Sequence, residues 1–121
     1  MRTLLMLLTG LTLSATALAA QVPSPIQLPQ ASPAASVSQA VGPATVAIEY
    51  HRPAVKARPV WGALVPYGQV WRTGANDATR IRFSDPVRVQ GQEVPAGTYA
   101  LFAIPTEKSW TMILNKKYEQ W

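Results

Sequence analysis

The sequence predicts an all-β fold, an antiparallel β-sandwich of jelly-roll-like or barrel-like form, and three observations support this. Short segments such as residues 45–51 and 79–84 alternate apolar and polar side chains with a period of two. Turn residues recur between these segments at the spacing typical of sandwiches and barrels. No segment keeps a 3.6-residue period, so no amphipathic helix is expected.

The chain begins with the features of a secretory signal peptide. Arg2 supplies a positive charge, a mostly apolar run follows it, and Ala17-Leu18-Ala19 has the small-residue pattern of a cleavage site. The apolar run is shorter than the ~20 residues of a membrane span. We therefore expect cleavage after Ala19, export to the periplasm or beyond, and no membrane span in the mature chain. An uncleaved signal anchor is the alternative.

Residues 20–34 combine four prolines with Gln, Ser and Ala, which is the composition of an extended linker. The folded part is expected over residues 35–121 as one β domain. Within it, a strand over residues 36–39 can pair with residues 45–51 across Val41-Gly42-Pro43. Later strands are expected over residues 79–84, 87–89, 98–104 and 110–115.

The later strands differ in how they are expected to be buried. Gln90-Gly91-Gln92 indicates a hairpin turn. Residues 98–104 are apolar on both faces, as in a central strand that is covered on both sides. Trp110 begins a regular strand, and we expect it to lie in the core.

Composition excludes several classes of function. The chain has no Cys, which excludes disulfides, thiolate metal sites, a Cys nucleophile and a lipid-anchored start. Loss of residues 1–19 removes Arg2 and leaves ten Lys and Arg against six Asp and Glu, a net charge of +4. These basic residues are scattered, so no nucleic-acid partner is expected. One His and widely spaced acidic residues predict no metal, and no motif indicates a cofactor.

The stretch from Val70 to Thr79 is the candidate site. Gly74 and Asn76 tolerate left-handed backbone, so a tight loop is expected directly before a strand. Arg72 could hold a carboxylate or phosphate, and nearby aromatic rings could stack on a sugar. The predicted ligand-binding residues are Tyr67, Trp71, Arg72, Thr73, Asn76 and Asp77.

The same residues have a purely structural interpretation. Arg72 could pair with Asp77, Asn76 could bond within its own turn, and the aromatic rings could pack in the core. His51 is the single candidate for proton transfer near neutral pH, and its place on the Glu49 face of a strand predicts partial exposure.

Several motifs together resemble an exported bacterial family, domain-of-unknown-function family 2911. They include Tyr50-His51-Arg52-Pro53, Leu64-Val65-Pro66-Tyr67-Gly68, the Val70-to-Thr79 stretch and Pro95-Ala96-Gly97-Thr98-Tyr99. The resemblance runs from about Ser32 to Trp121 and implies no activity. Family members usually continue for several strands, so the resemblance implies a chain shortened at its C-terminus, with weak stability or aggregation. Asp77 stands where the family commonly has Glu.

The expected function is that of a non-catalytic module that binds a small molecule or glycan, or that associates with the cell envelope. One alternative is a hydrolase that uses His51 with Asp77 or Glu49 beside Arg72. A second alternative is a structural domain that contacts another protein. An enzyme requires His51 and the Arg72 loop to converge, whereas a binding module requires exposed aromatic rings in a concave site.

Overall fold

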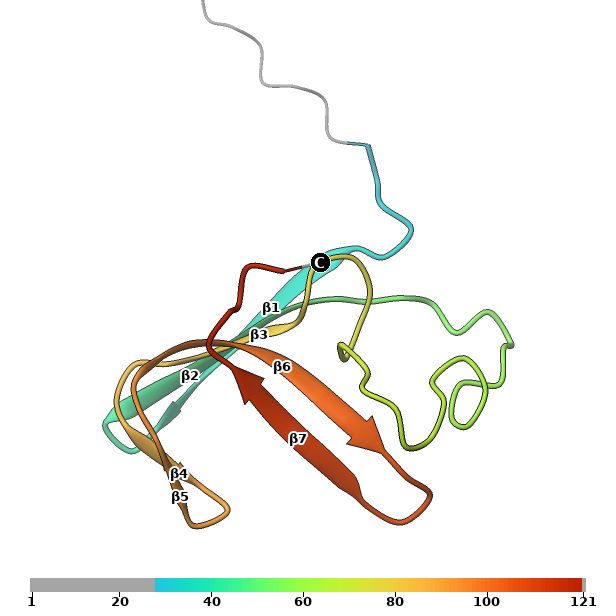
Figure 1. The fold of residues 1–121 in the computed structure, drawn as a ribbon. Coiled ribbons are helices and arrows are strands. Elements are labelled where there is room, and N and C mark those ends of the chain that lie inside the picture. The colour runs from blue at the N-terminus through green and yellow to red at the C-terminus, as the bar shows by residue number, and fades with distance from the viewer. Residues whose placement is uncertain (1–27, 121) are drawn as a thin grey trace, which may run out of the picture.

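The computed structural model describes residues 28–120, which form one five-stranded antiparallel sheet and a separate hairpin (Figure 1). The predicted signal peptide lies outside these residues. The sheet has the strand order β1-β2-β3-β6-β7, and β4 pairs with β5. The strands are β1 (Ala34–Val41), β2 (Ala44–His51), β3 (Arg80–Phe83), β4 (Val87–Val89), β5 (Gln92–Val94), β6 (Gly97–Pro105) and β7 (Trp110–Asn115). The all-β class is thus confirmed, while the sandwich arrangement stays a prediction.

The β1–β2 and β4–β5 hairpins form where the sequence predicts them. β1 pairs with β2 across the turn at Gly42, whose φ is 58°, and β1 is longer than the predicted residues 36–39. The β4–β5 turn contains Gln90 at φ 48° and Gly91 at φ 80°. Two successive positive φ angles match the right-handed twist of the flanking strands, which explains a tight turn at Gln90-Gly91.

In its first three strands, β1, β2 and β3, the five-stranded sheet has one mainly polar and one mainly apolar face. Because side chains alternate along a strand, the register places Ser36, Glu49 and Arg80 in one row across β1, β2 and β3. The opposite face carries a row of Val37, Ile48 and Ile81. The alternation predicted for residues 45–51 and 79–84 is therefore what separates the two faces.

The core lies around β6, which is hydrogen-bonded to strands on both sides. Its buried side chains include Tyr99, Ala100 and Ala103, and Phe83 of β3 is buried beside them. The Phe83 and Tyr99 rings pack with centroids 6.1 Å apart. The central position predicted for residues 98–104 is confirmed, because β6 runs between β3 and β7.

The second half of β6 pairs with irregular chain instead of with β3. Trp71 and Ala103 exchange two backbone hydrogen bonds of 2.7 and 2.9 Å, and the Leu101 amide donates to the Thr79 carbonyl at 2.8 Å. The Gly68 amide reaches the Pro105 carbonyl at 2.9 Å. The segment 68–79 therefore continues the place of β3 in the sheet without being a regular strand.

Trp110 corrects one prediction, because 44% of this residue is exposed and it is not in the core. It begins β7, which is an outer strand of the sheet, so one side of its ring has no neighbouring strand to cover it. Among residues 28–120 no helix is present that is long and apolar enough to cross a membrane.

Candidate functional site

Two pockets lie on either side of the predicted loop. The first, here called the tryptophan pocket, has a volume of about 570 Å³ and includes Trp71, Arg72, Gly74 and Ala75 of the loop. The second, here called the histidine pocket, has about 290 Å³ and includes Asp77 and Ala78. The loop therefore contributes its first half to one pocket and its second half to the other.

The tryptophan pocket is walled by the long connection between β2 and β3, drawn in green to yellow in Figure 1. Its apolar walls include Val55, Val60, Leu64 and Val65 from this connection. Val65 is buried and its amide donates to the Val60 carbonyl at 2.8 Å, which closes the chain into a compact turn. In the sequence, these apolar residues lie between prolines and follow neither a helix nor a strand period. Their packing against one another could therefore not be predicted.

Three indole rings meet at this wall. Trp61 lies edge-on to Trp71 and to Trp110, with ring centroids 5.5 and 4.8 Å apart, and Trp71 and Trp110 are 5.9 Å apart. Edge-to-face contacts of this kind are favourable beyond the area that they bury. Trp61 is still 48% exposed, so its ring contacts solvent as well as its partners.

The charged residues in the lining of the tryptophan pocket are both basic. Arg58 and Arg72 line it, and none of the lining residues is acidic. The Arg58 side chain donates from Nε to the Val55 carbonyl at 3.0 Å and from a terminal nitrogen to the Ala54 carbonyl at 2.7 Å, which fixes its position. Arg72 is half-buried and is itself engaged in an interaction.

Within the loop, Thr73 and Asn76 hold the chain in shape. Both have left-handed backbone, with φ of 54° and 58°. The Thr73 hydroxyl donates to the Leu101 carbonyl at 2.8 Å, and the Asn76 side-chain amide donates to the Ser32 carbonyl at 3.3 Å. Neither residue is among those that line the two pockets. The structural interpretation placed the Asn76 bond within its own turn, whereas the structure places it on the Ser32 carbonyl, ahead of β1.

Gly74 and Thr79 close the loop. The Thr79 hydroxyl donates to the Thr73 carbonyl at 2.8 Å, and Thr79 is buried. A Cβ atom on Gly74 would lie 3.2 Å from the Thr79 hydroxyl oxygen and 3.5 Å from the His51 carbonyl oxygen. A side chain at residue 74 would therefore crowd the Thr79 hydroxyl, while its distance to the end of β2 would be that of an ordinary van der Waals contact.

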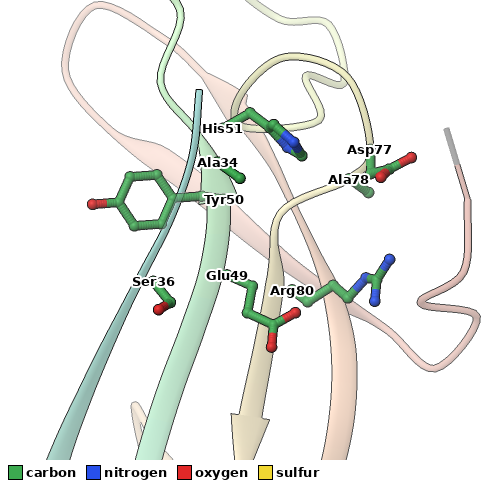
Figure 2. A pocket seen from close by; sticks show the side chains of 8 residues that line it. All are labelled: Ala34, Ser36, Glu49, Tyr50, His51, Asp77, Ala78 and Arg80. Atoms are coloured by element: carbon green, nitrogen blue, oxygen red, sulfur yellow. The ribbon is translucent and has the colours of Figure 1, made fainter. Parts of the chain in front are cut away.

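The histidine pocket gathers the polar side chains that the hydrolase interpretation named. His51, at the end of β2, and Asp77, in the loop, both line this pocket, and Figure 2 shows the Asp77 carboxylate turned away from the His51 ring. Glu49 and Arg80 stand opposite each other in the β2–β3 register and lie below them. His51 is half-buried, as its alternation in the strand predicts.

The structure separates Arg72 from this group, because Arg72 lines the tryptophan pocket and Arg80 takes the place beside His51. Among residues 28–120 the one salt bridge joins Arg88 to Glu93, so the suggested pair of Arg72 and Asp77 is not formed. In the same part of the chain, no three His, Asp or Glu side chains are placed to hold a metal ion.

Tyr67 lies apart from both pockets. A Cβ on Gly62 would come within 2.9 Å of the Tyr67 ring, so this ring rests directly on the Gly62 backbone. Of the six predicted ligand-binding residues, Trp71 and Arg72 line the tryptophan pocket and Asp77 lines the histidine pocket. Ser36 and Arg80 are pocket residues that the sequence did not single out, since only the strand register brings them opposite Glu49 in the pocket that His51 also lines.

Comparison with known proteins gives one family. The model of the family described as "Protein of unknown function (DUF2911)" matches residues 32–121, which include every described strand and both pockets. Searches of curated proteins and of solved structures found no match. The match covers most of the chain and agrees with the motifs around the Trp71 loop, and the chain therefore belongs to the DUF2911 family.

Proposed function

We propose that this chain is an exported, non-catalytic binding module and that the tryptophan pocket is its ligand site. One observation carries the proposal: a pocket of about 570 Å³ combines exposed indole and aliphatic side chains with two arginines and has no acidic residue in its lining. Small-molecule sites usually have this volume and this mixture of apolar walls and few polar groups. The leader-like first 19 residues support export.

The chemistry of the lining favours an amphipathic carboxylate. An apolar body would contact Trp61, Trp71 and Leu64, while the carboxylate would face the arginine side of the pocket. A neutral glycan is a poorer fit, because Asn76 and Asp77 lie outside this pocket and are not placed to bond to sugar hydroxyls there.

Titration calorimetry and tryptophan fluorescence test this with octanoate and octylammonium, which share one chain length and differ in charge. We expect octanoate to change the emission of the indole cluster and to bind at least about tenfold more tightly than octylammonium. Equal binding of the two probes would contradict the proposal, as would saturable binding of a neutral oligosaccharide at this pocket.

A matched pair of variants locates the site. Leu64→Glu places a carboxylate in the pocket at a residue that is 53% exposed, and we expect it to weaken octanoate binding by about tenfold or more. Val89→Glu introduces the same change at a 40% exposed residue of β4, outside the pocket, and should leave binding unchanged. Equal effects of the two variants would indicate that octanoate does not bind specifically in the tryptophan pocket.

A hydrolase is the second candidate, favoured by the presence of His51 and Asp77 in the lining of one pocket. In this reaction the His51 imidazole would accept a proton from a water molecule that attacks an acyl carbon, and the imidazolium would return that proton to the leaving alcohol as the acyl–oxygen bond breaks. Asp77, which lines the same pocket, would stabilise the imidazolium. Turnover of a panel of activated esters tests this candidate. We expect His51→Gln and Asp77→Asn each to lower it. Turnover that His51→Gln leaves unchanged would rule this candidate out.

A further inference from the structure

We infer that two copies of this chain pair through β1, edge to edge and antiparallel, so that the two five-stranded sheets become one. β1 is an outer strand of the sheet, and it is eight residues long. Outer strands present unpaired backbone groups, and proteins normally protect them with charged residues, proline, bulges or short length. β1 has none of these, because its sequence AASVSQAV carries no charge and no proline.

The other outer strand, β7, is protected in the usual way. Lys108 precedes it and Lys116 and Lys117 follow it, so positive charges flank both of its ends. Two β7 strands brought together would place these lysines near one another. Because β1 lacks such flanking charges and β7 has them, β1 is the outer strand that we expect to pair with a second copy.

The hydrogen-bond pattern shows which β1 groups face outward. The Arg52 amide donates to the Pro33 carbonyl at 2.9 Å, which makes these two residues a hydrogen-bonded pair at the end of the β1–β2 ladder. Because such pairs alternate along an antiparallel ladder, Ala35, Val37 and Gln39 also bond to β2. The amides and carbonyls of the intervening residues therefore point to the outer edge: Ala34, Ser36, Ser38 and Ala40.

This alternation restricts the register of a symmetric pair. Each outward residue must face another outward residue, and all four are used when Val37 lies on the two-fold axis. Ala34 then pairs with Ala40 of the second copy, and Ser36 pairs with Ser38. The Gln39 side chain, which bonds to the Ala40 carbonyl at 3.1 Å, moves aside in this arrangement.

The same register aligns the two faces of the sheet. Val37 is 53% exposed on the apolar face, and its side chain would pack against its symmetry mate. Pairing with an odd offset would place apolar side chains of one copy beside polar side chains of the other. A second copy in this register thus forms hydrogen bonds with the outward amides and carbonyls of β1. It also covers the exposed Val37 side chain.

Sedimentation velocity and light scattering over a wide concentration range test the pair with the purified chain. We expect a concentration-dependent dimer. Ser38→Pro removes an outward amide and leaves the β1–β2 ladder intact, so it should raise the dimer dissociation constant at least tenfold. Met112→Pro makes the matched change on β7, where alternation also turns the amide outward, and should leave the dimer unchanged.

Charge substitutions test the register. Ser36→Lys combined with Ser38→Lys places like charges opposite each other and should give a monomer, whereas Ser36→Lys combined with Ser38→Glu should restore the dimer. Circular dichroism checks that each variant keeps its strands. A monomer at every concentration would overturn the inference, and so would a dimer that Ser38→Pro and the paired lysines leave intact.

Discussion

Thr73 donates its hydroxyl hydrogen to the Leu101 carbonyl at 2.8 Å, although its own backbone lies in the left-handed region at φ 54°. This region is unfavourable for a β-branched residue. The bond to β6 is what holds Thr73 there, and it ties the middle of the loop to the centre of the sheet. The loop is thus supported by the core at the point where it passes between the two pockets.

Loss of this bond should destabilise the protein measurably. Thr73→Val keeps the branched shape but leaves the half-buried Leu101 carbonyl without its donor, and we expect the free energy of unfolding to fall by about 1–3 kcal/mol. Urea denaturation measures the change. Thr111→Val, at an exposed position of β7, should change stability by less than about 0.5 kcal/mol. Similar losses in both variants would contradict this role of Thr73.

Gly74 and Thr79 should be energetically coupled. Gly74→Ala places a methyl group 3.2 Å from the Thr79 hydroxyl oxygen, and Thr79→Ala removes that oxygen along with its bond to Thr73. The double variant should therefore lose less stability than the sum of the two single variants, by about 0.5 kcal/mol or more. In Thr79→Ser the oxygen remains, so this background should retain the full cost of Gly74→Ala.

Phe83 and Trp110 should differ in what they contribute to stability. Phe83 is 5% exposed, and Phe83→Ala should cost about 3–5 kcal/mol. Trp110 is half-exposed and holds its place through two ring contacts, so Trp110→Ala should cost only about 1–2 kcal/mol. Near-ultraviolet circular dichroism should nonetheless change strongly in Trp110→Ala, because the indole cluster is broken. If Phe83→Ala and Trp110→Ala lowered the melting temperature equally, Trp110 would contribute to stability as a core residue does.

The β4–β5 turn offers a stabilising substitution. Gln90 has a positive φ of 48° directly before Gly91, a position where asparagine is much more favourable. We expect Gln90→Asn to raise the free energy of unfolding by about 0.5 kcal/mol, measured as a higher melting temperature. Gln92→Asn lies in β5 and should not stabilise, since asparagine is disfavoured in strands. A loss of stability in Gln90→Asn would contradict the turn type.

Much of the fold could be predicted from residue patterns because strand alternation is a local property. The faces of β2 and β3, the turn at Gln90-Gly91 and the central place of β6 all follow from neighbouring residues. The exposure of Trp110 could not be predicted, since it depends on β7 being an outer strand, and strand order is set by contacts between distant residues.

The candidate site, too, could be predicted from the sequence only in part. Sequence identified the loop that borders both pockets, but it could not say that Thr73 and Asn76 would turn to backbone carbonyls while Trp71 and Asp77 line separate pockets. Those directions follow from left-handed backbone angles and from acceptor carbonyls at Ser32, ahead of β1, and at Leu101 in β6. The presence of Arg80 in the same pocket as His51 likewise arises from the register between β2 and β3, which pairs Arg80 with Glu49.

The pairing of Trp71 with Ala103 and of Thr79 with Leu101 has a consequence for chain length. Both ends of the loop are fastened to β6 at neighbouring positions, so the number of residues between them decides which side chains emerge toward each pocket. A single inserted or deleted residue would turn Arg72 or Asp77 to the wrong side even if every residue type were kept. Length variation among related chains should therefore fall in the connection before Gly68, where the chain can lengthen without changing this spacing.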